Sequence, residues 1–353
     1  QRKVYPDNNP LNTMTKLTLK PLGLLVLPFV CIASLNAQTV ADPVGVVKVT
    51  IAAAPAAGQS KLTSISATLR GAIDYQGTAT SIGTFATTSQ PLNTGVTTWT
   101  ATQWTAEPHL CYIENAAGAE EAYLISSMDE STGVLTLATT FDFSTRYTTT
   151  PTFRICKAQT MGSLFGTVPA SVPFKQDLSA SNADNIFIWN GTAWDTFWHD
   201  GTTWTSTTIF GSANDSVVFP DEGMFVLRRD VTDVVITLNG AVPTKEQIST
   251  VSGDGLTFLS TRYPIDTTVA DLGLTSITGW VTSIDSSSAD RFFVWNGSSW
   301  GTFWHDGTTW VSTTVFGNAN DEIIPADSAI FVRRISAGTE INSANTHTTP
   351  YTP

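Results

Sequence analysis

The sequence predicts an all-β protein: an N-terminal β domain, either a barrel or a sandwich, followed by two duplicated, Trp-rich antiparallel β modules. Beyond residue 37 no segment keeps the three- and four-residue apolar spacing of an amphipathic helix. Short runs rich in β-branched and aromatic residues, bounded by Gly, Asn, Asp and Pro, occur throughout. Residues 183–226 also recur at 289–332 without a gap, and 27 of the 44 aligned positions are identical. Such a repeat indicates one β unit built twice.

Residues 14–37 have the pattern of a secretory signal peptide. Two lysines precede an apolar run over residues 22–35, and Ala37 provides a small residue for cleavage before Gln38. The run is short for a bilayer span, so we expect no integral membrane segment in the mature chain. The expected location is secreted or at the cell surface, with the periplasm as the alternative.

Charge and composition exclude one class of partner. The chain carries a formal net charge of −12, and only 14% of its residues are charged. A surface that acidic repels a phosphate backbone, so nucleic acid is not expected as a partner. The low charge content and the many Thr, Ser and Gly residues suit an exported β protein.

The N-terminal β domain is expected over residues 38–158. Copy 1 of the β module is expected over residues 159–235, and the connecting strands and copy 2 over residues 236–353. Strands of the N-terminal domain are predicted at 44–51, 62–69, 109–115, 121–128, 134–141 and 152–158.

Each module is predicted to contain a three-stranded meander. Asn190-Gly191 and Asp200-Gly201 are the dipeptides of two-residue hairpin turns, because both central positions of such turns need a positive φ. As two-residue loops they would pair Trp189 with Thr192 and Trp198 with Thr203. The second copy keeps both turns, at Asn296-Gly297 and Asp306-Gly307.

Alternation along the strands gives each meander two apolar faces. In copy 1 one face collects Phe187, Trp189, Trp194 and Trp198, and the other Ile186, Ile188, Phe197 and Trp204. In copy 2 the faces are Phe293, Trp295, Trp300 and Trp304, and Phe292, Val294, Phe303 and Trp310. A sheet with one wet face alternates apolar with polar residues, so this meander must be covered on both sides or present an aromatic strip to a ligand.

Eight of the eleven tryptophans lie in the two copies and are the candidate ligand or packing residues: Trp189, Trp194, Trp198, Trp204, Trp295, Trp300, Trp304 and Trp310. An indole can stack on the apolar face of a sugar. Burial in a core removes the same side chain from water and stabilises the fold. Core or inter-module packing is the favoured role, and sugar stacking is the alternative.

No catalytic, cofactor-binding or metal site is expected. His199 with Asp200, and His305 with Asp306, are repeated pairs, but each leads into an Asp-Gly turn, which accounts for the aspartate. No nucleophile or second acid is placed against the histidines by the sequence. Enzymatic activity is therefore not predicted.

Two cysteines, Cys111 and Cys156, follow the predicted signal peptide, and both fall in predicted strands. In an exported chain they could form a disulfide. The other arrangement is two buried, unpaired thiols on neighbouring strands, and the sequence leaves both open.

Several short motifs resemble an uncharacterised family of secreted bacterial β proteins. They are Asp-Pro-Val-Gly at 42–45, Gly-Ser-Leu-Phe-Gly at 162–166, and the repeated Trp-Asn-Gly motif closing in Phe-Val-Arg-Arg or a similar strand. The similarity covers most of residues 42–336. It implies secretion and β architecture, and it implies no activity.

These patterns favour a secreted, non-enzymatic structural or surface protein that self-assembles as an envelope or extracellular filament component. Its expected partner is a second copy of itself. The alternative is a carbohydrate-binding or adhesive surface protein that uses the repeated Trp faces to bind polysaccharide.

Overall fold

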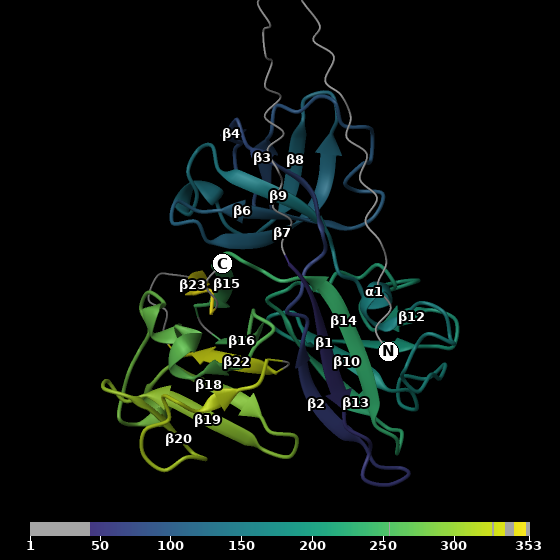
Figure 1. The fold of residues 1–353 in the computed structure, drawn as a ribbon, viewed down its shortest axis with the longest axis vertical. Helices are drawn as coiled ribbons and strands as arrows, with labels where there is room; N and C mark the ends of the chain where they lie inside the picture. Colours follow the sequence, from purple (N-terminus) through teal and green to yellow (C-terminus); the bar gives the residue numbers. More distant parts are fainter. Residues whose placement is uncertain (1–42, 254, 327, 336–341, 351–353) are drawn as a thin grey trace, which may run out of the picture. The chain divides into compact units, whose positions relative to one another are not determined.

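The computed structural model describes residues 43–253, 255–326, 328–335 and 342–350, and this part is nearly all β (Figure 1). The predicted all-β fold is confirmed. Its helical turns are α1 (Met161–Phe165), η1 (Phe143–Thr145), η2 (Ala270–Leu272), η3 (Leu274–Ser276) and η4 (Ser286–Ser288). Among the described residues no helix has the length and apolarity to cross a membrane. The predicted signal peptide, residues 14–37, lies outside the described residues.

The N-terminal domain is built on one sheet with the strand order β3-β9-β6-β7-β8-β5-β4. Its strands are β3 (Ile73–Thr78), β4 (Ser81–Ile82), β5 (Ser89–Asn93), β6 (His109–Glu114), β7 (Glu120–Asp129), β8 (Val134–Ala138) and β9 (Thr152–Lys157). The long strand β7 pairs with β6 and, after a register shift between Ile125 and Ser127, with β8. One core takes buried side chains from both halves, among them Leu92 and Ile155, so the sheet curves around it.

Two later strands add to this sheet. β15 (Gln247–Ser252) pairs with β23 (Asn342–His347) along six residues, and Gln247 pairs in parallel with Glu120 of β7. The C-terminal part of the chain is therefore connected to the N-terminal domain by main-chain hydrogen bonding.

Each copy of the repeat folds as a five-stranded antiparallel sheet. Module 1 has the order β12-β11-β10-β13-β2, with β2 (Lys61–Ser66), β10 (Asn185–Trp189), β11 (Trp194–His199), β12 (Trp204–Ser206) and β13 (Gly223–Arg228). Module 2 has the order β20-β19-β18-β22-β16, with β16 (Gly255–Ser260), β18 (Arg291–Trp295), β19 (Trp300–His305), β20 (Trp310–Ser312) and β22 (Ala329–Arg334). The short pair β17 (Thr267–Thr268) and β21 (Ile323–Ile324) completes module 2.

The N-terminal domain is an insertion in module 1. β2 and β16 are equivalent edge strands, because each pairs with the last strand of its module. In module 1 the chain leaves β2, forms β3 to β9, and only then returns to the repeat at α1. The domain boundaries stay predictions, and strand pairing crosses them where β2, inside the range 38–158, pairs with β13.

A separate ribbon covers module 1. β1 (Val44–Ile51) and β14 (Val234–Ala241) pair antiparallel along eight residues. Val49, Ile51 and Leu238 of this ribbon are buried in the same core as Ile186, Phe197 and Trp204 of the module sheet. The ribbon therefore closes a two-layer sandwich over one face of the meander.

The predicted meanders are present, but their register differs from the predicted one by two residues. Trp189 pairs with Trp194 rather than Thr192, and Trp198 pairs with Thr205 rather than Thr203. Four residues therefore form each loop. The Asn190 Oδ1 atom accepts hydrogen bonds from the main-chain N–H of Thr192 and of Ala193, at 3.1 and 2.8 Å, which stabilises the wider turn.

The two-residue change in register does not alter which side chains share a face of the meander. Side chains alternate with a period of two, so a shift of two residues leaves every side chain on its original face. Ile186, Ile188, Phe197 and Trp204 lie in the module 1 core, and Phe292, Phe303 and Trp310 in the module 2 core, with Val294 packed against it.

Candidate functional site

The opposite faces of the two meanders pack against each other. We call this contact the seam and define it as the cluster Leu62, Phe187, Trp189, Phe225, Leu256, Phe258, Phe293, Trp295, Ala329 and Phe331. Its rings stack closely: the Phe258 centroid lies 4.8 Å from that of Phe225 and 4.5 Å from that of Phe331. Each meander is thus covered on both sides, by its own core and by the other module.

Equivalent residues of the two modules make reciprocal contacts across the seam. The Trp189 Nε1–H donates to the Leu256 carbonyl oxygen at 3.0 Å, and the Trp295 Nε1–H donates to the Leu62 carbonyl oxygen at 2.9 Å. The ring of Trp194 meets Phe331, and the equivalent Trp300 meets Phe225, at 5.6 and 5.8 Å. Such reciprocity is the pattern of an isologous interface, formed here within one chain.

A glycine permits a close approach of the two modules. Gly223 and Ala329 are equivalent, and a Cβ atom at Gly223 would lie 2.4 Å from the Ala329 Cβ. No pair of carbon atoms tolerates that distance without a shift, so residue 223 must lack a side chain. Gly223 is the first residue of β13.

The eight repeated tryptophans fall into four equivalent pairs. Trp204 and Trp310 are buried in the module cores, and Trp189 and Trp295 are half-buried in the seam. Trp198 and Trp304 are half-buried, and within the described part of the chain their Nε1 atoms have no hydrogen-bond partner. Trp194 and Trp300, at the margin of the seam, are 36% and 40% exposed. The eight therefore do not form an exposed row.

One repeated feature has no counterpart in the sequence interpretation. Phe210 and Phe316 are equivalent residues at the tips of the loops after β12 and β20, and both are fully exposed. The alignment contains the signal, because Phe-Gly recurs in both loops among polar residues. Neither ring takes part in a hydrophobic core of the described residues.

The repeated histidines support turns. The His199 Nδ1 atom accepts from the Gly201 N–H at 3.2 Å, and the His305 Nδ1 atom accepts from the Gly307 N–H at 3.1 Å. Hydrogen bonds from the main-chain N–H groups of Thr309 and Thr308 lower the pKa of Asp306 to about 2. This carboxylate is therefore ionised at neutral pH, and it already accepts hydrogen bonds from its own turn. In the structure the His199–Asp200 and His305–Asp306 pairs therefore stabilise the turns that they begin.

Both cysteines are free and buried, which is the second of the two arrangements left open by the sequence. Cys111 pairs with Ile155, so it is offset by one residue from Cys156 on the neighbouring strand. Their side chains consequently point to opposite faces, Cys111 into the N-terminal core and Cys156 toward module 1. Burial raises the pKa of both thiols, that of Cys156 to about 12.

We expect neither Cys111 nor Cys156 to react with iodoacetamide in the native protein, because a buried thiol with a raised pKa supplies little thiolate. Both should be alkylated in urea without a reducing agent. Peptide mass spectrometry of the two samples locates the label. A Cys111–Cys156 cross-linked peptide in the non-reduced digest would contradict the free thiols.

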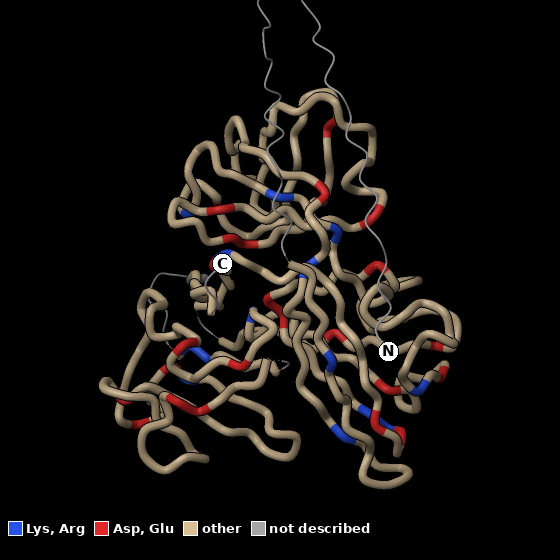
Figure 2. The backbone as a smooth tube through the Cα atoms, in the orientation of Figure 1, with Lys and Arg blue, Asp and Glu red and all other residues tan. Residues whose placement is uncertain are grey.

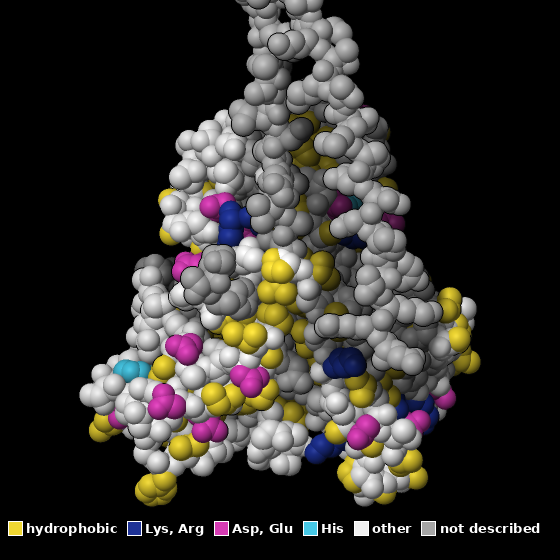
Figure 3. All heavy atoms as spheres, viewed as in Figure 1, with side chains coloured by type: hydrophobic (Ala, Val, Ile, Leu, Met, Phe, Trp, Pro, Cys, Tyr) yellow, Lys and Arg dark blue, Asp and Glu magenta, His cyan; other side chains and the backbone are white. Residues whose placement is uncertain are grey.

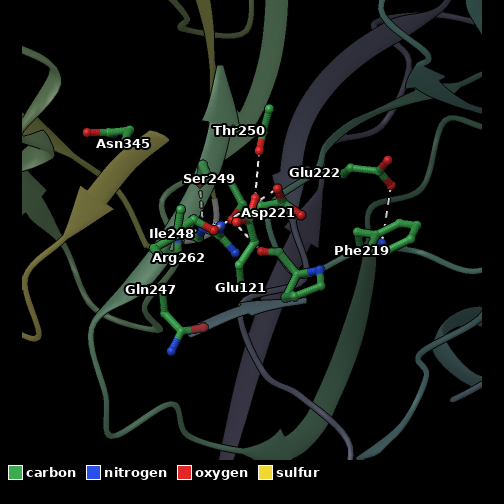
Figure 4. A network of polar contacts seen from close by, with 12 residues as sticks. Glu121, Phe219, Asp221, Glu222, Gln247, Ile248, Ser249, Thr250, Arg262 and Asn345 are labelled. Carbon is green, nitrogen blue, oxygen red and sulfur yellow. Dashed lines mark hydrogen bonds and ion pairs between the residues drawn. The ribbon is translucent and has the colours of Figure 1, made fainter. Parts of the chain in front are cut away.

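A buried polar network joins the N-terminal domain, module 1 and β15 (Figure 4). The Glu121 carboxylate on β7 accepts from the hydroxyls of Tyr147 and Thr250, at 2.7 and 2.6 Å, and is paired with Arg146. Arg262 lies 3.6 Å from Asp221, whose pKa is raised by burial. These buried polar groups have hydrogen-bond or ion-pair partners within the network. The network therefore helps to hold the N-terminal domain, module 1 and β15 together.

Charged residues are sparse along the rest of the backbone (Figure 2). Among the described residues no group of three or more His, Cys, Asp or Glu side chains could hold a metal ion. No protein-family model matches the chain, and it matches neither a curated protein nor a solved structure. The resemblance to secreted bacterial β proteins therefore stays a prediction.

Proposed function

We propose that this protein is a secreted, non-enzymatic structural component that self-assembles at the cell envelope or in an extracellular filament. The observation that carries the proposal is the β1–β14 ribbon. Apart from a bridge between Arg70 and Ala241, the outer edges of β1 and β14 have no strand partner among the described residues. An unpaired edge eight residues long can hydrogen-bond to a strand of another copy.

The outward face of the ribbon carries three exposed valines among the polar residues Lys48, Thr50, Thr237 and Asn239. Val44, Val46 and Val235 are all more than half exposed, and Lys48 is the one basic residue of the two strands. Figure 3 shows exposed hydrophobic side chains gathered in the middle of the face in view, with isolated charged groups around them. Apolar contact would add to main-chain pairing between copies.

The outer edges of the module meanders, β12 and β20, are less suited to this role. β12 and β20 have three residues each, and the Asn214 and Asn320 side chains accept from the main-chain N–H of their first residues, Trp204 and Trp310. Short, capped edges are how β proteins avoid pairing with other chains. The ribbon is therefore favoured over these two edges.

The alternative function, polysaccharide binding on the repeated Trp faces, requires exposed indoles in a row. The seam instead uses Trp189 and Trp295 for packing between modules. Trp194 and Trp300 are partly exposed, but their rings contact Phe331 and Phe225. This arrangement favours the structural role for the tryptophans.

Static light scattering of the mature chain over a micromolar concentration range tests self-association. We expect the average mass to grow with concentration. Substitution of Val44 and Val46 by lysine should move growth to at least about tenfold higher concentration, because charge on the ribbon opposes close pairing. The matched control is Val168→Lys, at a residue of similar exposure in a loop, and it should assemble like the wild type. A strictly monomeric wild type would refute the proposal.

A further inference from the structure

A cleft of about 760 Å³ lies between the inserted N-terminal domain and module 1. Its apolar lining comes from both parts, Pro108 and Leu124 from the first and Ile209, Val217 and Phe219 from the second. Trp189 and Phe197 also border the cleft, but their rings pack in the seam and in the module 1 core. The volume falls within the range of small-molecule sites, and ligands often bind where two domains meet. The cleft shares only Trp189 with the cluster that defines the seam, and it shares no residue with the β1–β14 ribbon.

Hydrogen-bonding groups line the same cleft. They include Asn190, Asp195 and Glu222, and the Asn190 amide donates to the Asp195 carboxylate at 3.2 Å. The Glu222 carboxyl accepts from the Phe219 N–H at 3.2 Å and is directed away from the Arg262 cluster in Figure 4. Burial, with Asp221 beside it, raises the pKa of Glu222 to about 8, so this group is mostly protonated at neutral pH and has an O–H to donate.

The internal duplication provides a comparison. In the described chain no domain is inserted between β16 and β18 of copy 2, and this copy carries Gly301 and Ser328 where copy 1 carries Asp195 and Glu222. Asn190 and Trp189 are unchanged in the second copy. Asp195 and Glu222 thus occur only in the copy whose surface forms the cleft, whereas Asp215, the third acid of the lining, has its equivalent in Asp321.

The lining chemistry restricts the ligand. Among the described residues no Lys, Arg or His lines the cleft, and its acidic groups disfavour phosphates, sulfates and carboxylates. Aromatic and aliphatic side chains offer an apolar floor, while carboxyl and amide groups both accept and donate hydrogen bonds. A sugar ring has the complementary pattern, an apolar C–H face ringed by hydroxyl groups. We propose that this cleft binds a short neutral saccharide, with Asp195 and Glu222 as hydrogen-bonding residues.

Saturation-transfer NMR of the mature chain with cello-, malto-, manno- and N-acetylglucosamine tetrasaccharides tests the proposal, and calorimetry measures any affinity found. We expect at least one neutral probe to bind. The double variant Asp195→Gly, Glu222→Ser should bind it at least about tenfold more weakly, a loss of about 1.4 kcal/mol. These are the residues of copy 2, where the equivalent turn still forms with Ser328 donating its N–H to the Pro325 oxygen, so folding should be kept.

Controls separate the cleft from other surfaces. Asp321→Gly removes an exposed acid of module 2 and should leave affinity unchanged, whereas Ser126→Trp should block the cleft from the side of the N-terminal domain. Absence of binding to every neutral probe would overturn the proposal, as would preferred binding of a polygalacturonate tetramer. Affinity lost in Trp194→Ala but kept in the double variant would place the sugar at the seam and would also overturn it. Self-association can fail independently of these results.

Discussion

Replacement of Asp290 by alanine is expected to lower the free energy of unfolding by about 3–5 kcal/mol. Asp290 and Arg334 are completely buried in module 2 and lie 3.3 Å apart. The carboxylate also accepts from the main-chain N–H of Val281 and of Ile335, at 2.9 and 2.8 Å. Without it a guanidinium charge and two N–H groups remain buried, which is the costly case for a buried ion pair.

Urea denaturation followed by tryptophan fluorescence measures this loss. The double variant Asp290→Leu, Arg334→Met should recover much of it, because replacing both charges by apolar groups removes the uncompensated one. Asp184→Ala is the matched test in module 1, where Asp184 is paired with Arg228. Asp74→Ala, at a partly exposed site 3.5 Å from His109, should cost less than about 1 kcal/mol. A similarly small loss for Asp290→Ala would show that the pair does not support the module.

The sequence predicts much of the module fold because its signals are local. Alternation along β10 and β11 fixes which side chains share a face, and this prediction does not depend on the turn type. The register does depend on it. Asn190 and Asp200 accept main-chain hydrogen bonds within four-residue loops, and the Asn-Gly and Asp-Gly dipeptides do not distinguish these loops from two-residue ones.

Long-range pairing is what the sequence does not reveal. β2 pairs with β13 across more than 150 residues, because the N-terminal domain is inserted between them. A weak signal was available: Leu-Thr-x-x-Ser occurs in both β2 and β16. β3 and β5 are not predicted, since Gly, Gln and Pro interrupt their apolar pattern, and β4 has only two residues.

The candidate sites show the same limit. Each meander has two apolar faces, so each face must pack against another part of the protein. No local sequence pattern identifies the other module as the part that covers the second face. The cleft exists only because an inserted domain lies beside module 1. Its acids could have been noticed as two of the differences between otherwise similar copies, Asp195 against Gly301 and Glu222 against Ser328. That both acids line one cleft follows from the tertiary structure and cannot be read from the sequence.

Replacement of Trp295 by alanine should destabilise the protein by about 3–5 kcal/mol and weaken the coupling between modules. Its ring packs in the seam, 5.2 Å from the Trp300 ring, and its N–H donates to the Leu62 oxygen of the other module. Trp295→Phe keeps most of the packing and removes the donor, so it should cost about 0.5–1.5 kcal/mol for the hydrogen bond, with some lost area added.

The reciprocal contacts make Trp189 a matched test. Trp189→Ala and Trp189→Phe should repeat both losses, because Trp189 donates to Leu256 as Trp295 donates to Leu62. Phe316→Ala, at a fully exposed ring, should change stability by less than about 0.5 kcal/mol. Calorimetry provides a second readout: one unfolding transition of the modules in the wild type should separate into two when the seam is weakened, since each module keeps its own core. Two separate transitions already present in the wild type would mean that the seam is a contact between independent modules and does not hold them as one folding unit.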